Sequence, residues 1–121
     1  MPKSLQPRRT ILVVEDEGLP LIHAVDLLED HGHAVIEARS GEEALRLLAE
    51  RPDVNVLFAD VRLPDLDGLE LARRAAVLRP DILLILTSGV THIPRHDLPL
   101  GTTFLQKPYS ARQVCRLVEA A

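Results

Sequence analysis

Five short apolar runs alternate with amphipathic stretches along this chain. The first, residues 10–14, is continuous and rich in β-branched side chains, which is typical of a strand buried on both faces of a parallel sheet. The same reasoning predicts strands over residues 34–37, 54–59, 82–86 and 102–106. The run over 82–86 is the most apolar of the five, so we expect it to be a central strand.

Apolar residues at helical spacing fill most of the intervals between these runs. The predicted helices cover residues 19–31, the stretch after Ser40, residues 69–78 and the stretch from Ser110 to about 119. Ser40 with Glu43 predicts a capping box, Asp67 and Ser110 are expected to cap the two later helices, and Gly32 supplies a stop signal.

The interval over residues 89–101 breaks this regularity. The alternation calls for a further helix there, but Pro94 and Pro99 each remove a backbone donor and clash with a preceding turn. We therefore expect the fourth helix to be short, irregular or partly a loop.

Strands that alternate with helices in this way predict an α/β fold, in which helices cover both faces of a doubly wound parallel sheet. A chain of 121 residues with 46% hydrophobic content can build one core, and it leaves no room for a second domain. We divide it into a flexible N-terminal arm, residues 1–9, and one domain over residues 10–121.

Charge and composition narrow the function. The net charge is -4 and the basic residues are dispersed, which argues against a nucleic-acid partner. The one basic cluster, Lys3, Arg8 and Arg9, lies in the proline-containing arm, and we interpret it as a solvated tail.

The single cysteine, Cys115, cannot form an internal disulfide, so nothing points to an oxidising compartment; we expect it to be a small buried side chain. There is neither an apolar stretch of membrane-spanning length nor a signal peptide. We therefore expect a cytoplasmic protein with no membrane partner.

Side chains suited to phosphate chemistry follow four of the five predicted strands. They are an acid pair, a lone acid, two hydroxyls and an amine: Glu15, Asp16, Asp60, Thr87, Ser88 and Lys107. The carboxyl ends of parallel strands meet at one edge of the sheet, where open α/β sheets bind ligands. We therefore expect an anionic, metal-binding and phosphate-compatible site at this edge.

The turn after the first strand excludes the usual nucleotide-binding loop, because it reads Glu15-Asp16-Glu17 where a glycine-rich turn would be needed. Three carboxylates would repel a bare phosphate unless they hold a cation, and Mg²⁺ suits one or two carboxylates plus water and a phosphoryl oxygen. With a metal present, Asp60 can serve as a nucleophile, since carboxylates form aspartyl-phosphate intermediates. Lys107 and a hydroxyl would then stabilise the phosphoryl charge.

Four segments together resemble the receiver domain of two-component response regulators, in its single-domain, chemotaxis-regulator-like form. They are ILVVEDE (11–17), DVRLPDLDG (60–68), LTSG (86–89) and FLQKPY (104–109). The resemblance extends from about residue 10 to residue 119. It implies a flavodoxin-like sheet of five parallel strands in the order 2-1-3-4-5.

The resemblance also implies a role for each residue of the site. Asp60 would accept a phosphoryl group from a phosphohistidine and would also bind Mg²⁺. Asp16 would bind the metal directly, Glu15 would bind it through water or orient it, and the backbone carbonyl of Arg62 would complete the protein ligands. Lys107 would pair with the phosphoryl group.

Two further features follow from the resemblance. The bond between Lys107 and Pro108 is expected to be cis, a conformation that only an X-Pro bond adopts cheaply. Ser88, 28 residues after Asp60, is preferred to Thr87 as the switch hydroxyl. Phe104 holds the position of the aromatic switch residue, although a phenylalanine in an amphipathic strand is equally well explained as part of the core.

The resemblance therefore implies a phosphorelay signalling switch rather than an enzyme. Its donor would be a sensor histidine kinase or a histidine phosphotransfer protein, and its output would be binding to a downstream protein. The start at Met1 favours a stand-alone receiver. A phosphate shuttle or sink, or a receiver domain from a longer hybrid kinase, are alternatives.

Two other classes fit less well. A phosphatase of the haloacid-dehalogenase type also uses an aspartyl nucleophile and Mg²⁺, but it needs an acid two residues later, where this chain has Arg62. A degenerate receiver that acts as a scaffold would lack the acceptor, the metal-binding acids or the lysine, and all are present.

Overall fold

The computed structural model describes residues 8–89 and 98–120 of the chain. One sheet contains five strands: β1 (Thr10–Val14), β2 (Ala34–Ala38), β3 (Val56–Asp60), β4 (Leu83–Ser88) and β5 (Thr103–Gln106). All neighbours are parallel, and the order is β2-β1-β3-β4-β5. The predicted doubly wound, flavodoxin-like sheet is confirmed.

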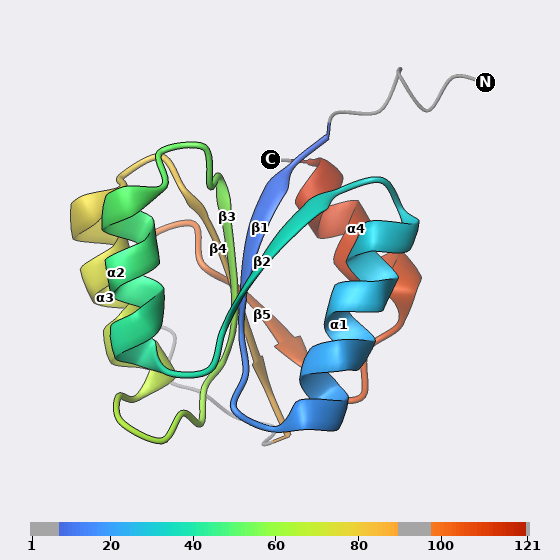
Figure 1. Cartoon of the computed structure of the whole chain (residues 1–121), viewed down its shortest axis with the longest axis horizontal. Helices are drawn as coiled ribbons and strands as arrows, with labels where there is room; N and C mark the ends of the chain where they lie inside the picture. The colour runs from blue at the N-terminus through green and yellow to red at the C-terminus, as the bar shows by residue number, and fades with distance from the viewer. Residues whose placement is uncertain (1–7, 90–97, 121) are drawn as a thin grey trace.

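Helices cover both faces of this sheet. They are α1 (Gly18–Asp30), α2 (Gly41–Glu50), α3 (Gly68–Leu78) and α4 (Ala111–Glu119). Helices α1 and α4 lie on one face, and α2 and α3 lie on the other (Figure 1). Most of the segment expected to hold an irregular helix, residues 90–97, lies outside the described residues, and the described residues 98–101 are not helical.

Alternating side chains of the strands divide the core into two clusters. Leu12, Leu57 and Leu86 pack under α2 and α3, whereas their neighbours Ile11, Phe58 and Ile85 pack under α1 and α4. All five residues of β3 are buried, because β3 occupies the middle of the sheet. The apolar run over 82–86 forms most of β4, which is an interior strand but not the middle one.

The N-terminus of α2 only partly follows the prediction. The Ser40 hydroxyl accepts a hydrogen bond from the Glu43 N–H at 3.1 Å, as expected for a cap. The carboxylate of Glu43 accepts from the Arg39 N–H at 2.8 Å instead of from Ser40. The reciprocal half of the predicted capping box is therefore wrong, because the side chain reaches one residue further back.

The other end signals act as predicted. Asp67 accepts from the Leu69 N–H at 2.7 Å and caps α3. Ser110 and Gln113 form a complete capping box at the start of α4. Gly32 ends the first helical segment with a φ of +90°, a conformation that an L side chain rarely adopts.

Arg9 is bonded into the domain, although the sequence placed it in a solvated arm. Its N–H donates to Nδ1 of His33 at 3.1 Å, and its Nε donates to the Val118 carbonyl at 3.3 Å. The contacts of the domain therefore include the last residue of the predicted arm. Residues 1–7 of that arm lie outside the described residues.

Two expectations about composition can be compared with the structure. Cys115 is buried at 5% exposure and is a free thiol, as predicted. Within the described part of the chain, no helix has the length and apolar character needed to span a bilayer.

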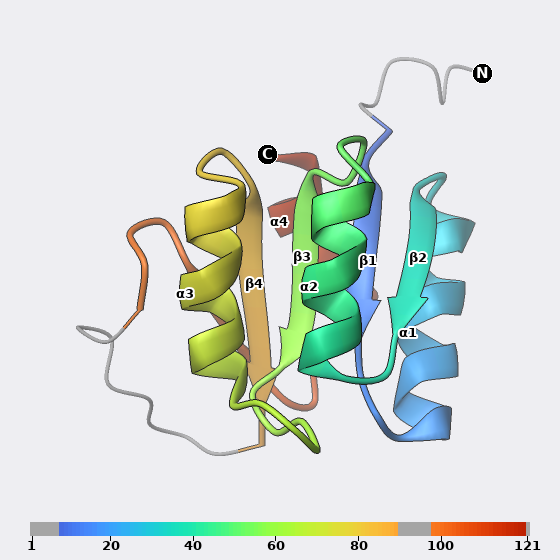
Figure 2. The ribbon, with the colours of Figure 1, turned by 60° about the vertical axis from the view of Figure 1, so that its left-hand side comes forward.

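The strands all point the same way, so their carboxyl ends form one edge of the sheet (Figure 2). The ends of β1, β3, β4 and β5 and the loops that follow them lie at this edge, and they carry the acids, hydroxyls and lysine that the sequence singled out.

Candidate functional site

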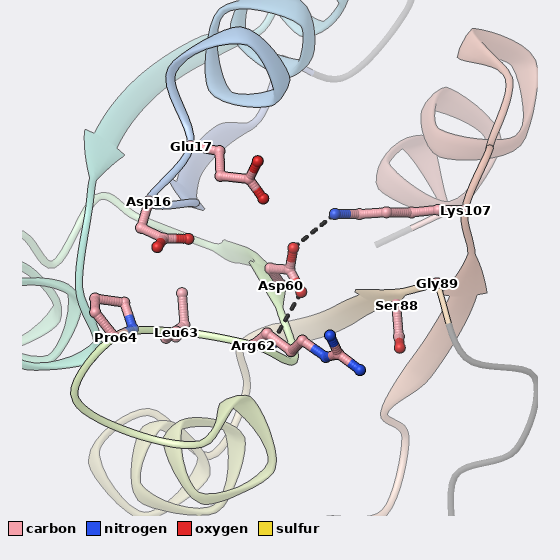
Figure 3. A pocket seen from close by; sticks show the side chains of 9 residues that line it. All are labelled: Asp16, Glu17, Asp60, Arg62, Leu63, Pro64, Ser88, Gly89 and Lys107. Atoms are coloured by element: carbon pink, nitrogen blue, oxygen red, sulfur yellow. Dashed lines mark hydrogen bonds and ion pairs between the residues drawn. The ribbon is translucent and has the colours of Figure 1, made fainter.

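A pocket of about 510 Å³ opens at the carboxyl edge of the sheet (Figure 3). The residues that line it come from the ends of β3 and β4 and from the loops after β1, β3, β4 and β5: Asp16, Glu17, Asp60, Arg62, Leu63, Pro64, Ser88, Gly89 and Lys107. Residues up to 91 positions apart in the sequence thus meet in one place because the parallel sheet brings the strand ends together.

Asp60 occupies the centre of this pocket. It is the last residue of β3 and is 8% exposed. One oxygen, Oδ1, accepts the Arg62 N–H at 2.9 Å, and the other, Oδ2, accepts from Nζ of Lys107 at 2.6 Å. Both hydrogen bonds are drawn in Figure 3. The carboxylate is therefore held in one orientation with both oxygens paired.

The start of α3 approaches the backbone of Asp60 closely. A Cβ placed on Gly68 would lie 2.5 Å from the Asp60 carbonyl oxygen and 2.6 Å from Cα of Val61. The Gly68 N–H also donates to the Val61 carbonyl at 2.8 Å. Only glycine fits here, and this close contact fixes the backbone on which Asp60 sits.

Lys107 lies just beyond the end of β5. Its N–H donates to the Ser88 carbonyl at 2.8 Å, which extends the β4–β5 pairing to the site. The Lys107–Pro108 bond is cis, as predicted. Nζ lies 2.6 Å from Oδ2 of Asp60 and 3.5 Å from Oε1 of Glu15. Burial lowers the pKa of the Lys107 ammonium, but the two carboxylates outweigh burial and raise the pKa overall.

Of the three acids after β1, only the last two line the pocket. Glu15 is 6% exposed, and its Oε2 accepts the Glu17 N–H at 3.2 Å. Burial, together with the charge of Asp60, raises the pKa of Glu15, although the Glu17 N–H and Lys107 act in the opposite direction. Asp16 and Glu17 are exposed and face the pocket.

The sequence therefore predicted that a run of acids follows β1, but it did not predict which of these acids line the pocket. It named Glu15 and Asp16 as metal-binding residues and did not include Glu17. The signal for Glu17 was its place as the third acid of the run. Leu63 and Pro64, which also line the pocket, were named only as parts of the segment DVRLPDLDG (60–68).

The donor set of the pocket fits Mg²⁺ with few protein ligands. Over residues 8–89 and 98–120, no three acidic, histidine or cysteine side chains converge in metal-binding geometry. Mg²⁺ usually keeps several waters and needs only one or two carboxylates. Asp16 and Asp60, which both line the pocket, carry carboxylate oxygens of the kind Mg²⁺ prefers. The backbone carbonyl of Arg62 as a further ligand stays a prediction. The acids outnumber Lys107 and Arg62, so a cation is favoured here.

The two hydroxyl residues at the end of β4 lie in different places. Ser88 lines the pocket, whereas Thr87 is 2% exposed and donates to the Ala59 carbonyl at 3.5 Å. Adjacent residues of a strand point to opposite faces, so only one of the pair can face the site in this way. The geometry favours Ser88 over Thr87 as the switch hydroxyl, which stays a prediction.

Phe104 is on the same face of the sheet as Ser88. It pairs in register with Leu86, two residues before Ser88, and it packs partly buried against the cluster under α2 and α3. This position is compatible with both predicted readings, a switch residue and a member of the core.

Arg62 places a cation where a phosphatase of the haloacid-dehalogenase type would need an acid. Its side chain is exposed and extends along the pocket on the side of Ser88 (Figure 3). The general acid required for hydrolysis of a phosphate ester is therefore absent from this position.

Comparisons with known proteins agree with this geometry. The family model described as "Response regulator receiver domain" matches residues 11–119. A "Response regulator receiver protein CpdR" of Brucella abortus is 32% identical over 114 residues, which cover 92% of this chain and 94% of that protein. A response regulator receiver protein of Sinorhizobium medicae has a crystal structure that superposes with a TM-score of 0.86 at 25% identity, covering 93% of each chain.

A second relative is much longer than this chain. A "Sensor kinase CckA" of Brucella abortus is 36% identical over 114 residues, which cover 91% of this chain but only 12% of the kinase. Similar sequences therefore occur both as nearly whole proteins and as small parts of large ones.

Proposed function

Because the chain belongs to the response regulator receiver domain family, which acts in two-component phosphorelay signalling, we propose that it receives a phosphoryl group on Asp60. The observation that supports this most strongly is the contact between Asp60 and Lys107. A buried carboxylate is paired with an ammonium at the centre of a pocket that also holds Asp16 and Ser88. The pocket therefore holds a side chain suited to each part that the proposed reaction needs: a nucleophile, a metal-binding acid, a hydroxyl and a cation.

In the proposed reaction, an oxygen of Asp60 attacks the phosphorus of a phosphohistidine on the donor protein. A P–O bond to the carboxylate forms as the P–N bond breaks, and the electron pair of that bond returns to the imidazole. No water enters the reaction. The Arg62 N–H keeps its hold on Oδ1 and so fixes the direction of attack.

The cationic and hydroxyl groups then stabilise the product. The Lys107 ammonium, paired with Oδ2 before reaction, exchanges that partner for a phosphoryl oxygen, and the Ser88 hydroxyl donates to another. Mg²⁺, when bound by Asp16, Asp60 and the Arg62 carbonyl, would supply positive charge. This charge would offset the acids that line the pocket, Asp16, Glu17 and Asp60, and so allow a phosphoryl group to approach. Glu15 is buried and does not line the pocket. It is proposed to orient the site through its contacts with the Lys107 ammonium and the Glu17 N–H.

The partners follow from this chemistry. We propose a histidine kinase or a histidine phosphotransfer protein as the donor and a downstream protein as the target. Signalling would result from a phosphorylation-dependent shift between conformations that involves Ser88 and Phe104. The net charge of -4 supports a target other than nucleic acid, and the unpaired cysteine supports a cytoplasmic location.

The test is intact-protein mass spectrometry after incubation with Mg²⁺ and acetyl phosphate. Wild-type protein is expected to gain the mass of one phosphoryl group only when Mg²⁺ is present, and Asp60→Asn is expected to gain none. Asp53→Asn, at an exposed aspartate paired with Arg51 outside the pocket, is the matched control and should gain phosphate like the wild type. A gain that persists in Asp60→Asn would refute the assignment of the acceptor.

A further inference from the structure

Asp65 connects the loop after β3 to the N-terminus of α2. Its Oδ1 accepts the Gly41 N–H and its Oδ2 accepts the Glu42 N–H, each at 2.9 Å. These donors are the first two residues of α2, and they lie 24 and 23 positions earlier in the chain. Both oxygens of an exposed side chain are thus engaged in a long-range contact.

Other contacts also hold the N-terminal part of α2. Ser40 caps the helix by accepting from the Glu43 N–H. Ala44 and Leu48 hold the helix in the core at 0% and 2% exposure. Of the two N–H groups that donate to Asp65, the one on Glu42 belongs to an exposed residue, where water can replace the carboxylate, whereas Gly41 is buried. Loss of Asp65 therefore leaves α2 its Ser40 cap and its core contacts but removes a link between the helix and the loop.

The loop in question, residues 61–67, carries the groups that surround the acceptor. Arg62 provides the N–H that binds Asp60, and its carbonyl is the proposed metal ligand. One end of the loop is fixed where Gly68 meets Val61. Val61 is bonded to β4 through the Thr87 carbonyl, and Leu63 and Leu66 pack partly buried against the core, while Asp65 adds hydrogen bonds to the start of α2.

Apolar packing reinforces the same attachment. A Cβ on Gly41 would lie 2.7 Å from Cβ of Leu66, so the residue after Asp65 lies directly on the first residue of α2. The two hydrogen bonds also lower the pKa of the Asp65 carboxyl, because both N–H groups favour its charged form.

We propose that Asp65 is a positioning residue for phosphoryl transfer: by tethering the β3–α3 loop to α2, it holds the amide and carbonyl of Arg62 in place at Asp60. This inference rests on the proposed function. Asp65 touches neither the acceptor nor the phosphoryl group, so its effect passes through the loop. Loss of an interaction that orients a metal ligand typically weakens metal binding by about tenfold or more.

The experiment compares four variants with the wild type. Asp65→Ala removes the tether, and Asp65→Asn removes the charge but keeps an oxygen that can accept from one N–H. Ser40→Ala removes a cap from the same helix end without touching the loop. Glu42→Gln removes one negative charge at the same helix end, which controls for long-range attraction of the cation.

Three quantities are measured for each protein. They are the dissociation constant for Mg²⁺ from a titration followed by backbone amide NMR, the hydrogen-exchange rate of the Arg62 amide without metal, and the rate of phosphate gain from acetyl phosphate. We expect Asp65→Ala to bind Mg²⁺ about tenfold more weakly, to exchange the Arg62 amide faster and to react more slowly. Asp65→Asn should lie between Asp65→Ala and the wild type, and both controls should stay within about twofold of the wild type.

Two results overturn the inference in distinguishable ways. If the wild type binds Mg²⁺ and gains phosphate while Asp65→Ala matches Ser40→Ala in all three measurements, Asp65 is only a helix cap. Equal losses in Asp65→Asn, Asp65→Ala and Glu42→Gln would show that charge alone is responsible. If the wild type itself neither binds Mg²⁺ nor gains phosphate, the proposed function fails, and the inference fails with it.

Discussion

The ammonium nitrogen of Lys107 lies 2.6 Å from Oδ2 of Asp60, although the two residues are 47 positions apart in the sequence. The pair is partly shielded, with side-chain exposures of 32% and 9%, and Glu15 lies 3.5 Å from the same nitrogen. One cation therefore compensates two carboxylates at the end of the sheet. We therefore expect substitutions of Lys107 and of the groups around it to change the stability of the domain and its phosphorylation.

Replacing Lys107 with Met should destabilise the protein and make Mg²⁺ more stabilising. The variant leaves Glu15 and Asp60 without their shared cation, and we expect the free energy of unfolding to fall by about 1–2 kcal/mol at pH 7, less than for a fully buried pair. A bound metal would replace part of the lost charge compensation. Urea denaturation with and without Mg²⁺ measures both effects, and an equal response to Mg²⁺ in variant and wild type would contradict the shared role of the lysine.

The two hydroxyls at the end of β4 should differ in their effect on phosphorylation. Ser88→Ala removes a hydroxyl from the pocket and should slow phosphate gain by about tenfold or more. Thr87→Val removes a buried hydroxyl that lies outside the pocket, and valine has the same branched shape as threonine. The rate of phosphate gain should therefore stay within about twofold of the wild-type rate. Time courses of mass gain with acetyl phosphate measure both rates. A slow Thr87→Val with a fast Ser88→Ala would reverse the assignment.

Gly68→Ala should destabilise the domain strongly, because the added methyl group would overlap backbone atoms of residues 60 and 61. We expect a loss of about 2–3 kcal/mol in the free energy of unfolding. Gly18→Ala is the matched control, since its Cβ would meet only a side-chain nitrogen at 3.8 Å at the start of another helix. Thermal and urea unfolding of both variants test this, and equal stability would mean that the strand end can move away from α3.

His33 should make stability depend on pH. It is 5% exposed, its Nδ1 accepts the Arg9 N–H, and burial lowers its pKa from the ordinary value of 6.5 despite Glu119 at 4.0 Å. The folded state thus binds fewer protons than the unfolded state just below pH 6.5. Stability is full above that pH and falls as the pH decreases toward the lowered value, by up to about 1.4 kcal/mol per pH unit.

Asn at position 33 tests this dependence, because its side-chain oxygen can accept from the Arg9 N–H but does not titrate. We expect His33→Asn to be less stable at pH 8 and to lose the slope between pH 6.5 and 5. His31→Asn, at an exposed histidine, should retain the slope. Free energies of unfolding from urea titrations at several pH values provide the measurement; an unchanged slope in His33→Asn would assign it to other groups.

Much of the fold was readable from the sequence because local patterns and the fold agree. The alternation of buried strands with amphipathic helices was sufficient for the sheet class, and the cap residues Asp67 and Ser110 marked helix starts correctly. The resemblance in four short segments added the strand order. The hydrogen-bond partner of a long, flexible side chain was less predictable. The Glu43 carboxylate accepts from the Arg39 N–H instead of from the Ser40 N–H, because a side chain of this length can extend to either backbone group.

The sequence by itself determined which chemistry stands at the strand ends: acids after β1 and at the end of β3, hydroxyls at the end of β4 and a lysine followed by proline after β5. Only the tertiary structure decided which of these groups face the pocket. Glu15 is buried while Glu17 lines the cavity, and Ser88 lines it whereas Thr87, the register partner of Asp60, does not. The reason is physical: the face that a side chain takes depends on where its strand stops and on its register with neighbours, and both are set by contacts between segments far apart in the chain.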